Sequence, residues 1–213
     1  MDANFWHNKW AKNEIAFHRD TANPLLVDHL KVLSLKKASA IFLPLCGKTL
    51  DIAWLLSKGY RVVGVELVES AIEQLFAELA MTPEVSTVGD IKHFNAQNID
   101  IYVGDIFAVT PTLLGAVDAI YDRAALVALP NEIRPQYAAH LMEITQQAPQ
   151  LLIAYHYDQH LVQGPPFSIS DQEVIQHYEQ HYTLTLIASV DVEGGMKGQC
   201  EATENVWLLS TIS

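Results

Sequence analysis

Short apolar runs alternate with segments of helical periodicity from residue 38 onward, and this alternation organises most of the chain. Apolar or β-branched runs predict five buried strands, at 40–45, 61–66, 99–103, 117–121 and 151–155. Apolar side chains recur at helical spacing between them, over 49–58, 69–79 and 133–147. Strands that alternate with helices predict βαβ units, and therefore a mostly parallel α/β sheet with helices on both faces.

The C-terminal segment breaks this alternation. Ser170-x-x-Glu173 is a capping box that predicts a helix to about Tyr182. Two predicted strands, 184–192 and 205–209, follow with no helix between them, so we expect an antiparallel hairpin. A parallel sheet closed by such a hairpin is the layout of class I S-adenosylmethionine methyltransferases, a Rossmann-like fold, whereas dehydrogenase-type Rossmann domains usually lack the hairpin. This analogy concerns the fold and does not establish a function.

The composition narrows the class of protein. The 213 residues are 50% apolar and 18% charged, which is typical of a globular chain and predicts one domain over 1–213. A net charge of −12 repels phosphate backbones and anionic lipids, so we expect no nucleic-acid or membrane partner. The N-terminus has no secretory h-region. Cys46 and Cys200 form no C-x-x-C pair, so we expect a reducing, cytoplasmic setting. We also expect a monomer.

The residues that end the predicted strands are the candidates for chemistry, because ligands bind beyond the carboxyl ends of strands in open α/β sheets. The first strand ends in Leu-Cys-Gly-Lys-Thr at 45–49, which is no P-loop because Phe42 stands where that motif needs its first glycine. Only Gly47 of a G-x-G-x-x-G turn is present, which argues against a ligand with a pyrophosphate. Taken alone, Gly47 is equally compatible with an ordinary strand-to-helix turn.

Two acids end the second and third predicted strands. Glu66 lies 19 residues after Gly47, where an acid typically binds ribose hydroxyls. The alternative is a solvated loop acid, and the spacing favours the ribose role. Asp105 could accept a hydrogen bond from an adenine amino group, with Ile106 against the ring. The alternative for this pair is a turn-forming Gly-Asp, which is common.

The fourth predicted strand ends in Asp122-Arg123, where class I methyltransferases place the methyl acceptor. A cation at position 123 suits an acceptor that is anionic or becomes so, and a structural Asp–Arg pair is the alternative. His177 and His181 are four residues apart and could bind a metal. No third ligand at metal spacing is evident, so a solvated helix face is favoured and we expect no metal site.

Aromatic side chains dominate the N-terminal segment. Trp6 and Trp10 are four residues apart and share a helix face, and Phe17 follows them. Asn23-Pro24 then predicts the start of a second helix with a leucine stripe behind it. Residues 1–35 are therefore expected to form an aromatic and helical lid. Beside a sulfonium cofactor, its aromatic faces also offer cation–π stabilisation.

Taken together, these motifs resemble the thiopurine S-methyltransferase family. The similarity runs in family order from about residue 4 to residue 209, and its segments are Phe5-Trp6-x-x-x-Trp10, Ala16-Phe17-His18, Leu43-Pro44-Leu45-Cys46-Gly47-Lys48, Val62-Val63-Gly64-Val65-Glu66 and Asp122-Arg123-x-Ala125-Leu126. Pro-Leu-Cys-Gly-Lys in place of a multi-glycine loop is specific to this family among S-adenosylmethionine enzymes. The short N-terminus is similar to the bacterial form.

The resemblance implies a class I fold and the transfer of a methyl group from S-adenosylmethionine to the sulfur of aromatic or heterocyclic thiols such as thiopurines, with S-adenosylhomocysteine as the product. It also implies the site residues. Arg123 would be catalytic, Phe17 and Arg123 would bind the substrate, and the cofactor contacts would be Trp10, Leu45, Glu66, Asp105, Ile106 and Arg123. Two places depart from vertebrate members: Asp105 has no acidic counterpart there, and residues 196–201 match poorly.

Three other functions are compatible with parts of this pattern. Bacterial relatives are associated with methylating selenium and tellurium derivatives, which are soft nucleophiles like thiolates. A nicotinamide oxidoreductase is disfavoured by the missing pyrophosphate glycines and by the C-terminal hairpin. A non-catalytic S-adenosylmethionine-binding protein is disfavoured by Arg123 and by the aromatic N-terminal segment.

Overall fold

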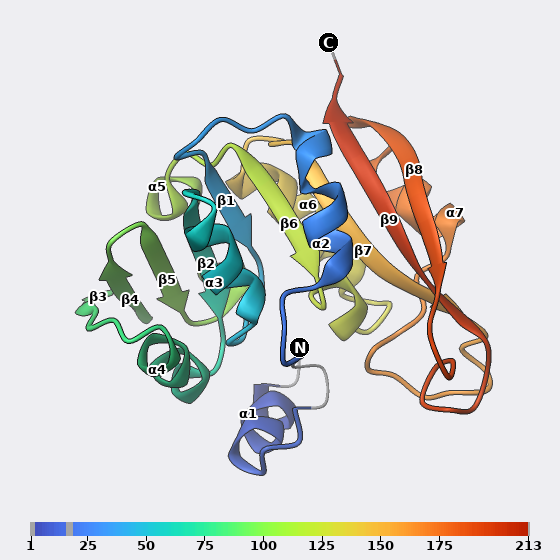
Figure 1. Ribbon diagram of the computed structural model, residues 1–213, viewed down its shortest axis with the longest axis horizontal. Helices are drawn as coiled ribbons and strands as arrows, with labels where there is room; N and C mark the ends of the chain where they lie inside the picture. The colour runs from blue at the N-terminus through green and yellow to red at the C-terminus, as the bar shows by residue number, and fades with distance from the viewer. Residues whose placement is uncertain (1–2, 16–18, 213) are drawn as a thin grey trace. The chain divides into compact units, whose positions relative to one another are not determined.

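Residues 3–15 and 19–212 are described by a computed structural model, in which the chain divides after Asp118 into two units (Figure 1). Both units contain parallel strand pairs, as the apolar runs predict. No helix in the described ranges is long and apolar enough to cross a membrane.

The strands of the first unit run in the order β3-β4-β5-β2-β1. β1 and β5 both pair parallel with β2, with Ile41 opposite Val62 and Gly64 opposite Ile101. These strands are almost entirely buried, because a parallel sheet is covered on both faces. The strand bounds are β1 (Ala40–Leu43), β2 (Arg61–Glu66), β3 (Glu84–Val88), β4 (Ile91–Ala96) and β5 (Ile99–Val103).

Helices α3 and α4 of this unit pack against β2. The predicted cap of α2 is confirmed, because the Asn23 side chain accepts a hydrogen bond from the Leu25 N–H at 2.8 Å. The Asn23 N–H donates in turn to Asp51 Oδ1 at 2.6 Å, which ties α2 to α3 through two buried residues. The helical segments are α1 (Ala3–Ala11), α2 (Pro24–His29), η1 (Leu30–Leu33), α3 (Leu50–Ser57), α4 (Glu69–Glu78), η2 (Ile106–Ala108) and α5 (Pro111–Leu114).

The hairpin of β3 and β4 was not expected from the sequence. Every residue of β3 is exposed, so this strand has no apolar run to reveal it. β4 pairs antiparallel with β3 and with β5, which adds an antiparallel edge to the parallel core. The available signal was Gly89-Asp90, a two-residue turn of the kind that joins hairpin strands.

The second unit orders its strands β6-β7-β9-β8. β6 and β7 are parallel, and β9 pairs antiparallel with both β7 and β8, so the expected C-terminal hairpin is confirmed (orange to red in Figure 1). Between Leu186 and Ala188 the register of β8 shifts at a β-bulge. The strand bounds are β6 (Ala119–Arg123), β7 (Gln150–Tyr157), β8 (Tyr182–Asp191) and β9 (Ala202–Thr211).

The helices of the second unit are α6 (Arg134–Ile144) and α7 (Asp171–Tyr178), with the short η3 (Leu126–Ala128) after β6. Half of the predicted capping box forms, because Ser170 Oγ accepts from the Glu173 N–H at 3.1 Å. The Glu173 carboxylate binds Arg134 instead of closing the box. α7 ends four residues earlier than expected, so His181 does not share its face.

Gly64 shows how tightly the core of the first unit is packed. A Cβ at this position would lie 2.7 Å from Ile101 Cδ1 and 2.9 Å from Cys46 Sγ. We therefore expect Gly64→Ala to lower the free energy of unfolding by about 1–3 kcal/mol, the usual cost of overpacking. The measurement is chemical denaturation monitored by tryptophan fluorescence.

The control for this prediction is Ile101→Val, which removes the crowded Cδ1 atom and alone costs about 0.5–1.5 kcal/mol. The double variant should be destabilised by less than the sum of the two single-variant costs, because the shorter side chain makes room for the new methyl group. Strictly additive costs would show that Ile101 does not limit the space at Gly64.

Candidate functional site

The carboxyl end of β2 is organised around Glu66, which is only 6% exposed. Its Oε2 accepts a hydrogen bond from the Gly47 N–H at 2.8 Å, and its Oε1 accepts one from the Val68 N–H at 2.9 Å. The backbone carbonyl of Glu66 accepts from the Gly104 N–H at 2.9 Å. One residue therefore links the loops that follow β1, β2 and β5, at the edge where ligands bind in such sheets.

The carboxylate of Glu66 keeps room for further hydrogen bonds. An ionised carboxylate offers about four acceptor positions, and the amides of Gly47 and Val68 occupy two of them. Burial raises the pKa of Glu66, and these backbone hydrogen bonds partly oppose that rise. The solvated-acid alternative is wrong because Glu66 is buried. The arrangement can accept the two hydroxyl protons of a ribose diol.

The loop after β1 turns sharply to reach Glu66. Leu45 has a φ of +46°, an uncommon backbone conformation for a residue with a side chain. Just beyond it, the Cys46 N–H donates to the Val65 carbonyl at 2.9 Å, which prolongs the β1–β2 ladder. Gly47 has a φ of +53°, and a Cβ there would lie 3.1 Å from the Trp10 ring. Both the turn and the close approach of Trp10 thus require glycine at position 47.

Helix α1 lies over these loops through Trp10, which is 7% exposed. Trp10 packs with Val68 and Ala71 in one apolar cluster, and Trp6 and Ile15 lie against the same cluster. The predicted common face of Trp6 and Trp10 is confirmed. Phe17 falls outside the described residues, together with the neighbouring Ala16 and His18, so its role at the substrate stays a prediction.

Asp105 and Ile106 follow β5. Asp105 is exposed, and its Oδ1 accepts a hydrogen bond from the Phe107 N–H at 3.0 Å, so the residue caps the turn η2. This is the turn-forming role that the sequence left open, and it uses one of the two carboxylate oxygens. Ile106 is almost completely buried. An adenine contact for either residue stays a prediction.

Cys46 lies within the same group of loops. Its side chain is buried against Gly64. Burial raises the pKa of the Cys46 thiol well above its ordinary value, and the nearby charge of Glu66 raises it further. A thiol in this environment is protonated at neutral pH and is no nucleophile.

The carboxyl end of β6 carries Asp122 and Arg123 on opposite sides of the strand. Asp122 is completely buried, with Oδ2 accepting from the Tyr137 hydroxyl at 2.7 Å and Oδ1 accepting from the Leu126 N–H at 3.1 Å. Neighbouring residues of a strand point to opposite faces. The carboxylate partners given for Asp122 are thus Leu126 and Tyr137, and among the described residues of this unit the structure gives no ion pair between Asp122 and Arg123.

Arg123 itself is half-buried, and Ala124 beyond it has a φ of +62°. Two of the four strand ends with candidate site residues thus carry a non-glycine residue in the left-handed region, Leu45 after β1 and Ala124 after β6. Such conformations cost energy and persist where surrounding contacts hold them. At the end of β6, the hydrogen bonds of Asp122 with Leu126 and Tyr137 stabilise the backbone next to Ala124.

Other polar groups do not add a metal centre to this picture. Among the residues that the structure describes, no group of three or more His, Cys, Asp or Glu side chains could hold a metal ion. His177 Nε2 instead contacts Glu173 Oε1 at 3.3 Å.

A groove of about 820 Å³ lies between the end of β7 and the β8–β9 turn, and its described lining includes the acidic Asp158, Asp191 and Glu201. This lining does not suit an anionic acceptor.

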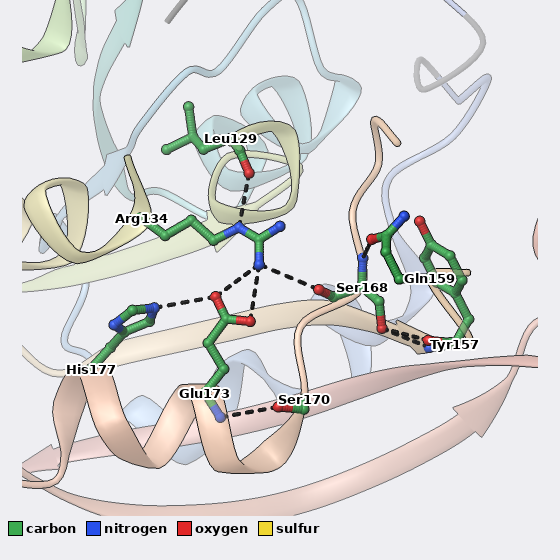
Figure 2. Close-up of polar contacts among 8 residues, drawn as sticks. All are labelled: Leu129, Arg134, Tyr157, Gln159, Ser168, Ser170, Glu173 and His177. Atoms are coloured by element: carbon green, nitrogen blue, oxygen red, sulfur yellow. Dashed lines mark hydrogen bonds and ion pairs between the residues drawn. The ribbon is translucent and has the colours of Figure 1, made fainter. Parts of the chain in front are cut away.

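A polar network that the sequence analysis did not single out lies after β7 (Figure 2). Its centre is Arg134, which is 4% exposed and contacts both carboxylate oxygens of Glu173. The two residues are 39 positions apart, so no local spacing signals the pair. The partial signals were an arginine at the start of a helix and the acid of the Ser170 capping box.

Burial raises the pKa of Asp122 to about 6, although the hydrogen bonds from Tyr137 and Leu126 oppose the rise. The ordinary value is 3.8, so the folded protein keeps this proton to a higher pH than the unfolded chain does. Protonated Asp122 therefore stabilises the fold at low pH. This contribution to the free energy of unfolding, about 3 kcal/mol in total, is lost as pH rises from about 4 to about 6.

Asp122→Asn should remove this dependence, because the amide has a similar shape and does not titrate. The free energy of unfolding of the variant minus that of the wild type should rise by up to about 3 kcal/mol between pH 4 and pH 7. Denaturant titrations across that range measure the difference. Tyr137→Phe removes a hydrogen bond that favours ionised Asp122 and should move the transition to higher pH. A difference independent of pH would contradict this account of Asp122.

Comparison with known proteins places this geometry in a family. The family model described as thiopurine S-methyltransferase (TPMT) matches residues 1–210. A thiopurine S-methyltransferase of Xanthobacter autotrophicus is 51% identical over 210 residues, covering 98% of this chain and 99% of the relative. One of Teredinibacter turnerae is 50% identical over 210 residues, covering 99% of this chain and 98% of the relative.

Solved structures support the fold at much lower identity. A Burkholderia thailandensis 1,6-didemethyltoxoflavin-N1-methyltransferase, with its substrate and S-adenosylhomocysteine bound, aligns with a TM-score of 0.67 at 14% identity and covers 99% of this chain and 87% of its own. A Methanosarcina mazei S-adenosylmethionine-dependent methyltransferase aligns with a TM-score of 0.64 at 13% identity, covering 91% of this chain and all of its own. The expected methyltransferase fold class is confirmed. With the family model matching nearly all of its length and relatives half identical to it, the chain belongs to the thiopurine S-methyltransferase family.

Proposed function

We propose that this chain transfers a methyl group from S-adenosylmethionine to the sulfur of small aromatic or heterocyclic thiols such as thiopurines. The reaction is supported by family membership over residues 1–210 and by relatives named thiopurine S-methyltransferase. The observation in the structure that carries the proposal is the buried Glu66 carboxylate bound to the Gly47 turn. This strand-end site suits a ligand with a ribose and without a pyrophosphate.

The residues of the first unit fit this cofactor. Glu66 would hold the ribose, because its carboxylate retains free acceptor positions beside the Gly47 turn. Trp10, Leu45, Asp105 and Ile106 would provide further cofactor contacts from this unit, and Arg123 would add one from the end of β6. S-adenosylmethionine, when bound, supplies a methyl group activated on a sulfonium, which leaves S-adenosylhomocysteine after transfer. The electron-rich face of Trp10 suits a sulfonium, since cation–π contacts contribute about 0.5–2 kcal/mol.

Arg123 would act on the acceptor. The positive charge of its guanidinium lowers the pKa of a nearby thiol. The resulting thiolate is a strong nucleophile, so no dedicated base is required and the thiol proton leaves to solvent. Asp122 and Tyr137 hold the end of β6 on which Arg123 stands. Alignment and electrostatics would therefore supply the rate enhancement.

We assign residues 1–213 to one methyltransferase domain in which residues 1–35 form a lid over the cofactor. The packing of Trp10 against the Gly47 turn supports the lid, because it places an aromatic side chain over the proposed site. Closure of such a segment excludes water from the reaction. Phe17 would then contact the aromatic substrate. The free thiols of Cys46 and Cys200 suit the cytoplasmic compartment that we propose.

Glu66→Ala should weaken the binding of S-adenosylhomocysteine by about 1.5–3 kcal/mol, the scale of hydrogen bonds to a charged group. Isothermal titration calorimetry measures the affinity. The matched control is Glu69→Ala, three residues further on, where the carboxylate forms an exposed ion pair with Lys92 at 2.6 Å. The control should bind like the wild type. Equal affinity in the Glu66 variant would remove the ribose assignment.

Arg123→Ala should reduce kcat/KM most for weakly acidic thiols, because a cation helps most where the thiol is not yet ionised. Arg123→Lys should keep part of the charge effect and lose the planar geometry of the guanidinium. A graded series of aryl thiols across pH tests this, with Arg61→Ala as the control because Arg61 is exposed and bound to Asp100. A uniform loss across the series would assign Arg123 to cofactor positioning instead.

A further inference from the structure

The loop between β7 and α7, residues 158–170, is fixed by a buried arginine (Figure 2). Arg134 Nη1 lies 2.8 and 2.9 Å from the two carboxylate oxygens of Glu173, and its Nε donates to the Leu129 carbonyl at 2.8 Å. A buried guanidinium is unfavourable unless its charge and its hydrogen bonds are matched in this way. Arg134 is therefore held rigidly between the end of η3 and the helix α7.

Glu173 is suited to hold this arginine. Burial raises the pKa of Glu173, but the hydrogen bonds and charges of His177 and Arg134 outweigh it and leave the pKa below its ordinary value. The carboxylate is thus ionised at neutral pH and complements the guanidinium. His177 Nε2 contacts Glu173 Oε1 at 3.3 Å and Ser170 Oγ accepts from the Glu173 N–H, which together fix the position of Glu173.

The loop attaches directly to this arginine. The guanidinium carbon of Arg134 lies 5.4 Å from the centre of the Phe167 ring, within cation–π range, and Nη1 lies 3.4 Å from the Ser168 carbonyl. The Phe167 N–H donates to the Val127 carbonyl at 2.6 Å. A Cβ on Gly164 would collide with the Phe167 ring, so the loop folds closely onto that ring.

Further hydrogen bonds make the loop a rigid unit. The Tyr157 hydroxyl donates to the Pro166 carbonyl at 2.6 Å, and the Ser168 N–H donates to Gln159 Oε1 at 2.7 Å. Lys197 Nζ donates to the Gln163 carbonyl at 2.9 Å from the turn between β8 and β9. The loop is fixed at its start, middle and end, and Arg134 is the charged group that connects it to η3 and α7.

The loop also begins at the edge of the sheet where the acceptor is expected. β6 and β7 are parallel neighbours with Arg123 opposite Ile153, so their carboxyl ends point the same way. β7 continues to Tyr157, and the loop starts there. Ligands of open α/β sheets bind beyond these ends. Phe167 and its loop therefore stand at the acceptor side of the unit that carries Arg123.

We propose that Arg134, held by Glu173, is a positioning residue that fixes the Gly164–Phe167 segment as a wall of the thiol pocket and so sets the affinity for larger acceptors. The inference rests on the proposed methyl transfer to thiols. Arg134 does not touch the reacting atoms in this account and acts through Phe167. A purely structural role for the same network would change protein stability and leave the affinity of the folded enzyme for thiols unchanged.

The test compares Arg134→Lys, Phe167→Leu and the double variant with the wild type, using one single-ring and one bicyclic aromatic thiol. Arg134→Lys should raise the KM for the bicyclic thiol by roughly tenfold, the scale of a lost charge-assisted hydrogen bond, and the KM for the single-ring thiol by less. The Kd for S-adenosylhomocysteine should stay within about twofold of the wild type. Arg61→Lys, the same exchange at an exposed ion pair, should change neither value.

The double variant decides between positioning and stability. If Arg134 acts through Phe167, the two changes in KM are not additive, and the double variant resembles the more affected single variant. Additive changes, or an unchanged KM with a lowered Tm, would overturn the proposal. If Arg134→Lys does not fold, Phe167→Leu alone still tests the wall, since it removes no charge and an unchanged KM for the bicyclic thiol rejects it. A wild type that methylates no thiol would instead reject the proposed function.

Discussion

The buried carboxylate at the end of β2 determines how the loops at the carboxyl ends of the first unit's strands are arranged. Glu66 is buried away from water, so its oxygens need hydrogen-bond donors from the chain itself, and the backbone N–H groups of Gly47 and Val68 supply them. This requirement brings the loops after β1 and β2 together before any ligand arrives. The loop that carries the Gly47 N–H to Glu66 passes through left-handed conformations at Leu45 and Gly47. The local strain of this turn is thus balanced by hydrogen bonds to a charged group.

The parts of this architecture that could be predicted are those that burial enforces. Strands covered on both faces must be apolar throughout, and the predicted bounds 61–66 and 99–103 coincide with β2 and β5. The Asn23 cap was predictable because it depends on residues adjacent in sequence. Glu66 could be identified as a candidate ligand-binding residue from its sequence separation from Gly47, since the length of a βαβ unit nearly fixes that separation.

The missed features share a different physical origin. The strand Glu84–Val88 is exposed on all its residues, so pairing through the backbone holds it there and its side chains carry little signal. Arg134 and Glu173 meet across 39 residues, and nothing local marks such a pair. Glu173 also shows that one motif can be used in part, because its backbone completes the cap while its carboxylate serves a tertiary contact. The ligand roles of the strand-end residues, and that of Phe17, stay predictions.

The burial of Cys46 has a consequence for an enzyme of this kind. A protein that handles an activated methyl group next to its own thiol risks alkylating itself, since sulfur is the atom on which the proposed reaction acts. Cys46 is the immediate neighbour of the Gly47 turn, yet its thiol is packed against Gly64 and beside the negative charge of Glu66, so it stays protonated. Burial, reinforced by the carboxylate that also binds the turn, therefore keeps this cysteine unreactive. Such an arrangement allows the thiolate of a substrate to be methylated while the Cys46 thiol is not.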